Sequence, residues 1–510
     1  MRLVVTTGTR PLVLVAPHGG RRDAARRPWT IGNLRMNDLH TAELTRELAA
    51  RTGASAVINA EHDRNDVDLN RISAAHEHAP AFLDRLLHVL GTVVARHGRA
   101  TLLALHGWNV VQPVVDVGLG CAPGDDPLVV GPRAAVTPRF AAGALPRFID
   151  ACDARGIGAT VGARYPARHR ENLLQLFTPR YRDDERALVR ALAALAPAVD
   201  ALQLELGIAL RWPGRWRDAL VAACEESLPA FLAPPDPTPR VAARPEIVPD
   251  AVARRLQFTS ADVSGLVALD RARGGRLLLF PAEGGLLLFT GERIGLAPAA
   301  VTGALDLRET AAAGVAVRFR GPLLRFPDTT PFLDLETGLA RATLADADVA
   351  LDFAPLHGDA ARNADFGVVR GVVRVDGVDQ AIAAAGFTED GPDPAIWPRL
   401  RAALRVGEKT HVAFTLALDG DAASGFLCTD GAHVAIVGGR AVLARGEAAL
   451  ERVEVTLELA DGARLDLAAH AVHRLPVIRA RGATPIRIEF AACRLDGETC
   501  PAGWLEAGGI

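Results

Sequence analysis

The sequence lacks the features of a disulfide-rich or membrane-spanning protein. Its six cysteines are scattered along 510 residues without a CxxC pair, which argues against a disulfide framework and a cysteine metal site. No apolar run approaches the roughly 18 residues that a membrane-spanning helix needs. The N-terminal residues also lack the basic region, apolar run and cleavage site of a secretory signal. These absences predict a cytoplasmic protein with reduced thiols and no membrane span.

A strong charge of one sign is missing as well. The formal net charge is -3, and the basic residues are nearly all arginine, which gives no reason to expect a nucleic-acid partner. What remains is an ordinary globular composition, with 49% hydrophobic and 23% charged residues. Because 510 residues exceed the size at which one core keeps growing, we expect two or three domains. The sequence leaves the oligomeric state open.

Residues 1–232 alternate between predicted strands and helices. Short apolar runs predict buried strands at residues 12–16, 56–59, 101–105 and 201–206. Helical spacing predicts helices at residues 41–51, 81–96 and 186–195. This alternation favours an α/β domain with a mixed, mostly parallel sheet that helices cover on both faces.

Residues 233–249 are rich in proline and poor in large apolar side chains, which is typical of a linker. Residues 250–510 then alternate apolar and polar side chains with period two. Asp-Gly pairs recur between these runs, at positions 376, 419, 430 and 461, and such pairs favour the turns of β-hairpins. The second half is therefore expected to be a mainly antiparallel β-domain, built as one barrel or as two similar halves.

Two histidines follow predicted strands of the first domain and are candidate metal ligands. His18 lies in the motif PHGG and His106 in the motif LHG, each at the carboxyl end of a strand. Ligands of open α/β sheets bind outside these strand ends, so both imidazoles are expected to face one crevice. The neighbouring glycines let the backbone turn sharply and leave space for a ligand.

A catalytic zinc site needs three protein ligands and one position left for water. Asp38 is the preferred third ligand, because it is expected in the first turn of the helix that follows the first buried strand, where a carboxylate is also favoured as a cap. Asp23 and Glu43 are the alternatives. Glu43 is less suitable because it lies a turn and a half inside that helix.

The segment from Glu61 to Arg71 is too polar to continue a core strand. Arg71 offers a planar fork suited to a substrate carboxylate, although it could instead pair with Asp66 or Asp68. Arg64 could polarise a scissile carbonyl.

Glu205 stands in the apolar run 201–206. A buried carboxyl group needs a role or a partner there, either as a general base or as an ion-pair partner of Arg211.

Over residues 10–215 the chain resembles the N-formylglutamate amidohydrolase family. The resemblance rests on five motifs in the same order: PHGG, the acid before a helix, DRNDVDLNR, LHG and LELG. Zinc carboxypeptidases are more distantly similar and share its α/β/α sandwich. The resemblance implies one zinc ion held by His18, Asp38 and His106. It also implies that Asn70 and Arg71 bind a substrate carboxylate, that Glu205 is the general base and that Arg64 stabilises the oxyanion. Where that family has a proline- and glycine-rich segment before the glutamate, this chain has residues 165–172.

The resemblance implies a metal-dependent hydrolase of C–N bonds that acts on a small-molecule or peptide substrate bearing a carboxylate. N-acyl amino acids and γ-glutamyl or peptide bonds are all compatible with these motifs. Residues 250–510 more faintly resemble lipocalin-like tandem β-domains, through the segment 367–392. An alternative hypothesis is therefore a β-domain that binds a lipid-like or other small molecule, fused to a degenerate hydrolase. The intact ligand motifs argue against such degeneracy.

Overall fold

The structure is a computed structural model, in which the described residues form two compact units, 3–234 and 254–508. Within these limits it describes residues 3–22, 35–121, 134–234, 254–270, 274–292, 305–310, 314–329, 332, 334–356, 364–390, 398–446, 449–481 and 484–508. Asp23 and most of the predicted linker, residues 235–249, lie outside the described part.

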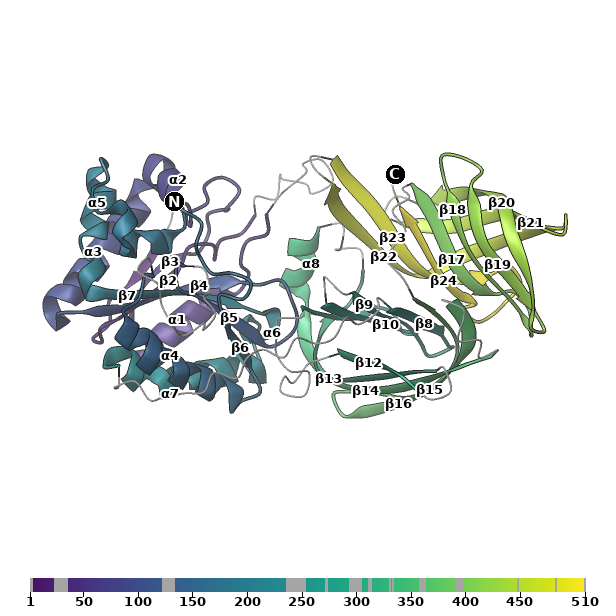
Figure 1. The fold of residues 1–510 in the computed structure, drawn as a ribbon, viewed down its shortest axis with the longest axis horizontal. Coiled ribbons are helices and arrows are strands. Elements are labelled where there is room, and N and C mark those ends of the chain that lie inside the picture. Colours follow the sequence, from purple (N-terminus) through teal and green to yellow (C-terminus); the bar gives the residue numbers. More distant parts are fainter. Residues whose placement is uncertain are drawn as a thin grey trace. The chain divides into compact units, whose positions relative to one another are not determined.

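The first unit is an α/β/α sandwich, as expected from the sequence (Figure 1). Its strands are β1 (Leu3–Thr6), β2 (Leu12–Ala16), β3 (Ser55–Asn59), β4 (Ala100–Gly107), β5 (Val114–Gly118), β6 (Gly158–Val161) and β7 (Val199–Leu206). Its helices are α1 (Thr41–Thr52), α2 (Ile72–His78), α3 (Pro80–His97), α4 (Pro138–Asp153), α5 (Ala187–Ala193), α6 (Ile208–Arg211) and α7 (Arg215–Leu232), with 3-10 turns η1 (Leu173–Phe177), η2 (Pro179–Tyr181) and η3 (Ala196–Ala198).

The seven strands lie in the order β1-β3-β2-β4-β7-β5-β6. The central strands β3, β2, β4 and β7 are parallel, whereas β1 and β5 run antiparallel to their neighbours β3 and β7. Helices α2, α3 and α5 cover one face, and α1, α4 and α7 cover the other (Figure 1). Strands β2, β3 and β7 are buried along their whole length, as expected for parallel strands covered on both faces. Because the central strands are parallel, their carboxyl ends lie at the same end of the sheet.

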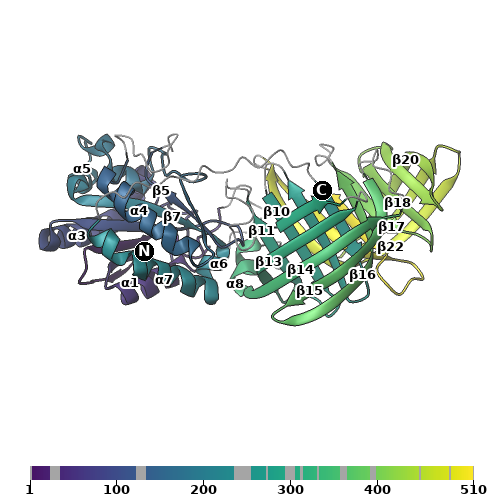
Figure 2. The ribbon, with the colours of Figure 1, turned by 60° about the horizontal axis from the view of Figure 1, so that its bottom comes forward.

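The second unit begins with nine strands in the order β11-β10-β9-β8-β16-β15-β14-β13-β12. They are β8 (Arg254–Thr259), β9 (Val263–Asp270), β10 (Gly274–Pro281), β11 (Leu286–Gly291), β12 (Leu305–Glu309), β13 (Val315–Phe326), β14 (Thr343–Pro355), β15 (Ala364–Val375) and β16 (Val378–Asp390), with helix α8 (Leu335–Arg341) between β13 and β14. Pairing of β11 with β13 closes these strands into a barrel (Figure 2), while β12 adds to the other part of β13.

Eight further antiparallel strands form a second closed barrel. They are β17 (Arg399–Arg405), β18 (Thr410–Ala417), β19 (Ala423–Thr429), β20 (Ala432–Arg445), β21 (Leu450–Leu459), β22 (Arg464–Arg481), β23 (Thr484–Leu495) and β24 (Gly503–Gly508). Alternate side chains of these strands point inward and pack into one apolar core. The expectation of a mainly antiparallel, lipocalin-like tandem is confirmed.

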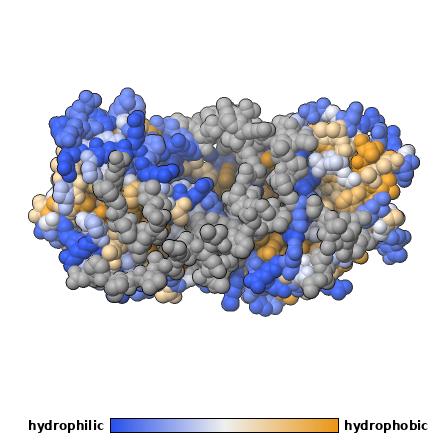
Figure 3. Space-filling model, in the orientation of Figure 1, coloured by the Kyte–Doolittle hydropathy of each residue, from blue (hydrophilic) through white to orange (hydrophobic). Residues whose placement is uncertain are grey.

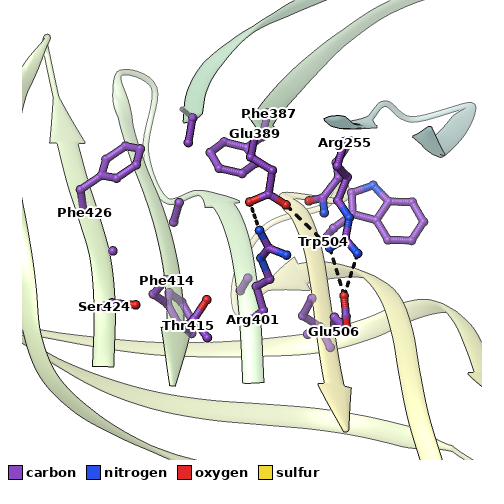
Figure 4. A pocket seen from close by; sticks show the side chains of 16 residues that line it. Arg255, Phe387, Glu389, Arg401, Phe414, Thr415, Ser424, Phe426, Trp504 and Glu506 are labelled. Carbon is purple, nitrogen blue, oxygen red and sulfur yellow. Dashed lines mark hydrogen bonds and ion pairs between the residues drawn. The ribbon is translucent and has the colours of Figure 1, made fainter. Parts of the chain in front are cut away.

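The two barrels meet at a charged seam formed by β8 and β16 of the first and β17 and β24 of the second (Figure 4). Glu506 accepts hydrogen bonds from Arg255 at 3.0 Å and from Arg399 at 2.9 Å. Arg401 pairs with Glu389 across the same seam. A small cavity of about 150 Å³ beside these ion pairs is lined by the charged residues and by apolar side chains that include Phe387, Phe426 and Trp504.

The outer surface is polar over the helices α2 and α5 of the first unit and more apolar over β19 and β20 of the second barrel (Figure 3). Val437 and Val442 on β20 are 59% and 64% exposed. No helix in the described part of the chain has the length and apolar character to cross a membrane.

Candidate metal centre

His18, Asp38 and His106 are brought together at the carboxyl edge of the central strands. His18 follows β2, and His106 is the penultimate residue of the neighbouring strand β4. The Oδ2 atom of Asp38 lies 3.2 Å from Nδ1 of His18 and 3.1 Å from Nδ1 of His106. All three side chains are buried, and they form the one histidine, cysteine or acidic cluster of metal-binding geometry within the described ranges.

The spacing of these donors fits a metal ion. Zinc bonds of about 2.0–2.1 Å at tetrahedral angles place neighbouring donor atoms about 3.3 Å apart. The His18–Asp38 and His106–Asp38 separations of 3.2 and 3.1 Å match such tetrahedron edges. The two imidazole rings meet edge to face, with 4.9 Å between centroids, so their Nδ1 atoms converge on the same carboxylate oxygen. The donor set is therefore compatible with one metal ion.

Asp38 does not open the helix as the sequence predicted. Helix α1 begins at Thr41, and Asp38 lies in the preceding loop. Its backbone N–H donates to the His18 carbonyl at 2.8 Å, while its own carbonyl accepts from the Thr41 hydroxyl at 2.6 Å. The loop is thus tied to the segment after β2, which places the Asp38 carboxylate beside His18. Glu43 lies on α1 and pairs with Arg21, away from the cluster.

Asp68 is a further residue of the site, and its contact with His18 was not predicted from the sequence. Its Oδ1 atom lies 2.7 Å from Nε2 of His18, and Arg35 approaches its Oδ2 at 2.8 Å. Because a carboxylate only accepts, His18 donates from Nε2 to Asp68. Nδ1 is then the nitrogen of His18 that faces Oδ2 of Asp38, at 3.2 Å.

The charges of the cluster follow from burial and hydrogen bonding. Burial raises the pKa of Asp38, but hydrogen bonds from His106 and His18 outweigh it and hold the pKa well below 3.8. Burial lowers the pKa of His106 to about 4, against the opposing effect of Asp38. At neutral pH the site therefore presents an ionised carboxylate and a neutral His106 imidazole, the forms in which both side chains bind metals.

Glu205 stands beside His106 on the adjacent parallel strand, because the two residues pair in the register of β4 and β7. Its Oε1 accepts a hydrogen bond from Gln203 at 2.7 Å. Burial, reinforced by the nearby charge of Asp38, raises the pKa of Glu205 well above 4.5. Arg211, the alternative partner, instead donates hydrogen bonds to the backbone carbonyls of Leu206, Leu39 and Trp108, so Glu205 is left facing the cluster.

Arg64 reaches the same carboxylate from the polar segment after β3. Its Nη1 lies 3.2 Å from Oδ1 of Asp38 and also donates to the Met36 carbonyl at 3.0 Å. The Nε atom of Arg64 is buried and has no hydrogen-bond partner among the described residues. A donor is therefore available next to the cluster.

Asn70 and Arg71 line the same cleft, which has a volume of about 550 Å³. The Asn70 carbonyl oxygen Oδ1 accepts from the backbone N–H of Leu173 at 3.1 Å, so much of this side chain holds the loop that carries Leu173. Arg71 uses Nη1 on the Asn70 backbone carbonyl at 3.0 Å. Asp68, one of the two alternative partners of Arg71, is paired with His18 and Arg35.

The opposite wall of the cleft is the loop after β6, which includes Arg164, Tyr165 and Arg168. Asp116 on the antiparallel strand β5 holds this loop from below. Its fully buried carboxylate accepts from the backbone N–H groups of residues 163, 164 and 165 at 3.0, 2.8 and 2.6 Å. The wall is thus anchored through its backbone, beside the strand that carries Glu205.

The glycines beside the histidines are explained by contacts within the chain. A Cβ atom on Gly19 would lie 2.7 Å from the Asn59 carbonyl oxygen, and one on Gly107 would lie 2.7 Å from Nη1 of Arg211. These glycines therefore make room for Asn59 and Arg211, and Gly107 also lines the cleft beside the cluster.

Comparisons with solved structures find low-identity similarities. The chain is similar to N-formylglutamate amidohydrolase from Ralstonia eutropha JMP134, with 12% identity, a TM-score of 0.32, and coverage of 45% of this chain and 96% of that one. It is similar to an AttH-type protein of Nitrosomonas europaea, with 11% identity, a TM-score of 0.27, and coverage of 53% and 99%. It is also similar to kievitone hydratase from Nectria haematococca, with 8% identity, a TM-score of 0.30, and coverage of 52% and 92%.

No family model matches the sequence, and a search of curated proteins found no match. At such identities and scores, the chemistry of the site has to be inferred from its own side chains.

Proposed function

We propose that the first unit is a zinc-dependent amidohydrolase that cleaves an amide-type bond near a carboxylate. The observation that carries this proposal is the convergence of His18, Asp38 and His106, with donor atoms 3.1–3.2 Å apart, next to Glu205 on the adjacent strand. His18, Asp38 and His106 would hold one zinc ion, which when bound supplies Lewis-acid activation of water and of an amide carbonyl.

Glu205 is proposed as the general base and acid. Its raised pKa suits a carboxylate that takes a proton from the attacking water and returns it to the leaving nitrogen. The amide C–N bond breaks as the new C–O bond forms, giving one carboxylic acid and one amine. Arg64 is proposed to stabilise the oxyanion, because its Nη1 lies 3.2 Å from Oδ1 of Asp38 while its buried Nε–H has no partner among the described residues.

Arg71, with Asn70, is proposed to hold the substrate's carboxylate. Its guanidinium lines the cleft and donates from Nη1 to the Asn70 backbone carbonyl. The other N–H groups of this planar side chain are further donors that a carboxylate could accept from. Fixing that carboxylate orients the neighbouring amide, and such positioning is a large part of catalysis. The substrates that fit are N-acyl amino acids and γ-glutamyl or peptide compounds.

Zinc analysis combined with a substrate panel tests the proposal. The full-length protein is stripped of metal, reloaded with zinc and assayed on N-formyl, N-acetyl and γ-glutamyl amino acids and on their carboxamide-capped analogues. We expect zinc at one ion per chain and hydrolysis of at least one carboxylate-bearing substrate. Absence of bound zinc and of hydrolysis across the panel would contradict the proposal.

The variant Arg71→Met separates carboxylate binding from catalysis. It should raise KM about tenfold or more for the carboxylate-bearing substrate, since a charge-assisted bidentate pair is lost. The carboxamide-capped analogue should show almost no change, and the exposed Arg51→Met serves as a matched control. An equal effect on both substrates would contradict the proposed role of Arg71.

The binding hypothesis for the β-domain has less support. Its motivating segments, 277–280 and 286–289, consist mostly of buried core side chains, with Leu277 and Phe280 at 0% exposure. Phe280 packs against Trp504 with 5.4 Å between ring centroids. Packing of the barrel explains these apolar faces, so the hydrolase remains the proposed function.

A further inference from the structure

Arg211 is a buried cation directly behind the candidate metal centre. It ends the one-turn helix α6, which follows β7, and it is 1% exposed. Its guanidinium makes three hydrogen bonds to backbone carbonyls. Nε donates to Leu206 at 3.0 Å, Nη1 to Leu39 at 2.7 Å and Nη2 to Trp108 at 3.1 Å.

The three carbonyls belong to the three segments that carry the site. Leu39 follows Asp38, Leu206 follows Glu205, and Trp108 lies two residues after His106. A guanidinium group is planar and its N–H directions are fixed. One rigid side chain therefore joins the loop before α1 to the ends of β4 and β7.

The chain makes room for this group at Gly107. A Cβ atom there would lie 2.7 Å from Nη1 and 2.8 Å from Cζ of Arg211, and 3.1 Å from Cβ of Asp38. Any larger residue between His106 and Trp108 would push the guanidinium and Asp38 apart. The guanidinium of Arg211 can therefore occupy its position only because residue 107 is a glycine.

Stability alone does not account for Arg211. Burial lowers its pKa to about 10, with Asp38 and Glu205 acting in the opposite direction, so it stays charged at neutral pH. Its guanidinium donates to three neutral carbonyls and lies 5.2 Å from the centroid of the Trp212 ring, and removing such a cation from water carries a large desolvation cost. A well-packed apolar side chain would fill the same volume without that cost.

We propose that Arg211 is a positioning residue that sets the distance between the metal ligands and the general base. The proposal rests on the proposed hydrolase function and extends it. Arg211 does not reach the cleft, since it is absent from the cleft lining. It acts by fixing Asp38, His106 and Glu205 through the backbone that follows each of them.

Cobalt substitution tests this role with a readout other than activity. The full-length protein and its variants Arg211→Met and Arg211→Lys are loaded with Co²⁺, and the visible absorption spectrum and the Co²⁺ dissociation constant are recorded. We expect a shifted spectrum and a dissociation constant raised about 10- to 100-fold, as for other groups that orient metal ligands. The control Arg399→Met removes a fully buried guanidinium from the barrel unit, where it pairs with Glu506, and should leave both unchanged.

Kinetics on the zinc enzyme divides positioning from substrate binding. Both Arg211 variants should lower kcat about 100-fold, as expected for a displacement near 1 Å. KM should change less than about twofold, because Arg71 and the cleft walls are untouched. Lysine should not rescue kcat, because one ammonium group cannot bind three carbonyls in the fixed directions of a guanidinium.

Gly107→Ala provides a second route if the Arg211 variants do not fold. It retains Arg211 but crowds its guanidinium, and it should reproduce the shifted cobalt spectrum and the lower kcat. Variants that match the parent in spectrum, affinity and kcat would overturn the role of Arg211 alone. A parent protein that binds no cobalt and hydrolyses no amide would overturn the proposed function and this role together.

Discussion

Two buried glutamates in this protein have opposite electrostatic surroundings. Burial raises the pKa of Glu506, but Arg255 and Arg399 outweigh it and hold the pKa below 4.5. Burial also raises the pKa of Glu205, and the nearby Asp38 raises it further. Glu205 has no ion pair with an arginine in the described part of the α/β unit, whereas Glu506 has two in the barrel unit.

The difference separates a stabilising charge from a reactive one. Ionised Glu506 is favoured in the folded barrels, so its pairs contribute to stability at neutral pH. Ionised Glu205 is disfavoured in the folded α/β unit, so it reduces stability at neutral pH while staying able to exchange a proton. A carboxyl group without a strong cation partner is what general acid–base chemistry requires.

The largest expected effect concerns catalysis. Glu205→Gln should lower kcat by about 10²- to 10⁴-fold, because the general base is lost while the size of the side chain is kept. Zinc content should stay at the parent level, since Glu205 is not among the three proposed ligands. Steady-state kinetics and metal analysis on the same preparation measure both quantities.

The matched control for catalysis is Glu506→Gln, which removes a buried glutamate from the other unit. Its kcat per folded molecule should equal that of the parent. The comparison between the two glutamates would fail if Glu205→Gln retained full activity.

The next effect concerns the stability of the barrels. Glu506→Gln leaves Arg399, whose side chain is fully buried, without its charged partner. Breaking a buried ion pair from one side costs about 3–5 kcal/mol. Hydrogen exchange of peptides from β17 and β24 should accelerate accordingly, while peptides from β4 and β7 should not change. Glu408→Gln, at an exposed position of the same barrel, should have almost no effect on either set.

A smaller effect of opposite sign is expected in the α/β unit. In metal-free protein at pH 7, Glu205→Gln should stabilise the fold by on the order of 1 kcal/mol or more, because a disfavoured buried charge is removed. Slower hydrogen exchange in β4 and β7 would report this gain. The exposed Glu77→Gln provides the baseline. Destabilisation by Glu205→Gln would show that Glu205 is held by a favourable charge, as Glu506 is.

The smallest effect is the onset of acid destabilisation. The folded pKa of Glu506 is lowered, so its stabilising effect is complete above the unfolded value near 4.5 and is lost as pH falls through the folded value. At pH 4.5 most of this stabilising effect should still be present, and the loss should become larger only at lower pH. Glu205 has the opposite sign, because its folded pKa is raised. Calorimetry of parent and Glu506→Gln should show less acid sensitivity of the barrel transition in the variant.

Local sequence signals predicted the hairpins of the second unit well. Asp376 and Gly377 have φ angles of 49° and 84°, and Asp430 and Gly431 have 45° and 87°. A type I′ turn requires positive φ at both central residues, which Asp-Gly pairs adopt readily. Closure into barrels was not predictable in the same way, since it depends on the pairing of β11 with β13, strands separated by β12.

The sequence predicted residues that the fold brings together in one cleft, but not how they are held. His18, His106 and Glu205 stand at or just beyond strand ends, where a parallel sheet places functional groups. The sequence offered Asp68 as a partner of Arg71 and Arg211 as a partner of Glu205, but their observed partners were not predicted, because these lie 50 residues away for Asp68 and up to 172 for Arg211. Asp38 was expected in the first turn of helix α1 but lies in the loop before it. A backbone hydrogen bond to His18 ties this loop to the segment after β2, and no local sequence pattern signals such a contact.

The anchoring of the cleft wall by Asp116 has a consequence for how this protein could change its specificity. Asp116 holds the loop through the main-chain N–H groups of residues 163, 164 and 165, which nearly every amino acid provides, and its other hydrogen bond comes from the hydroxyl of Thr160 on β6. Side chains at positions 164, 165 and 168 can therefore be exchanged while the loop keeps its path. Substitutions in this wall could therefore change the substrate preference repeatedly while the proposed metal ligands and Glu205 stay in place.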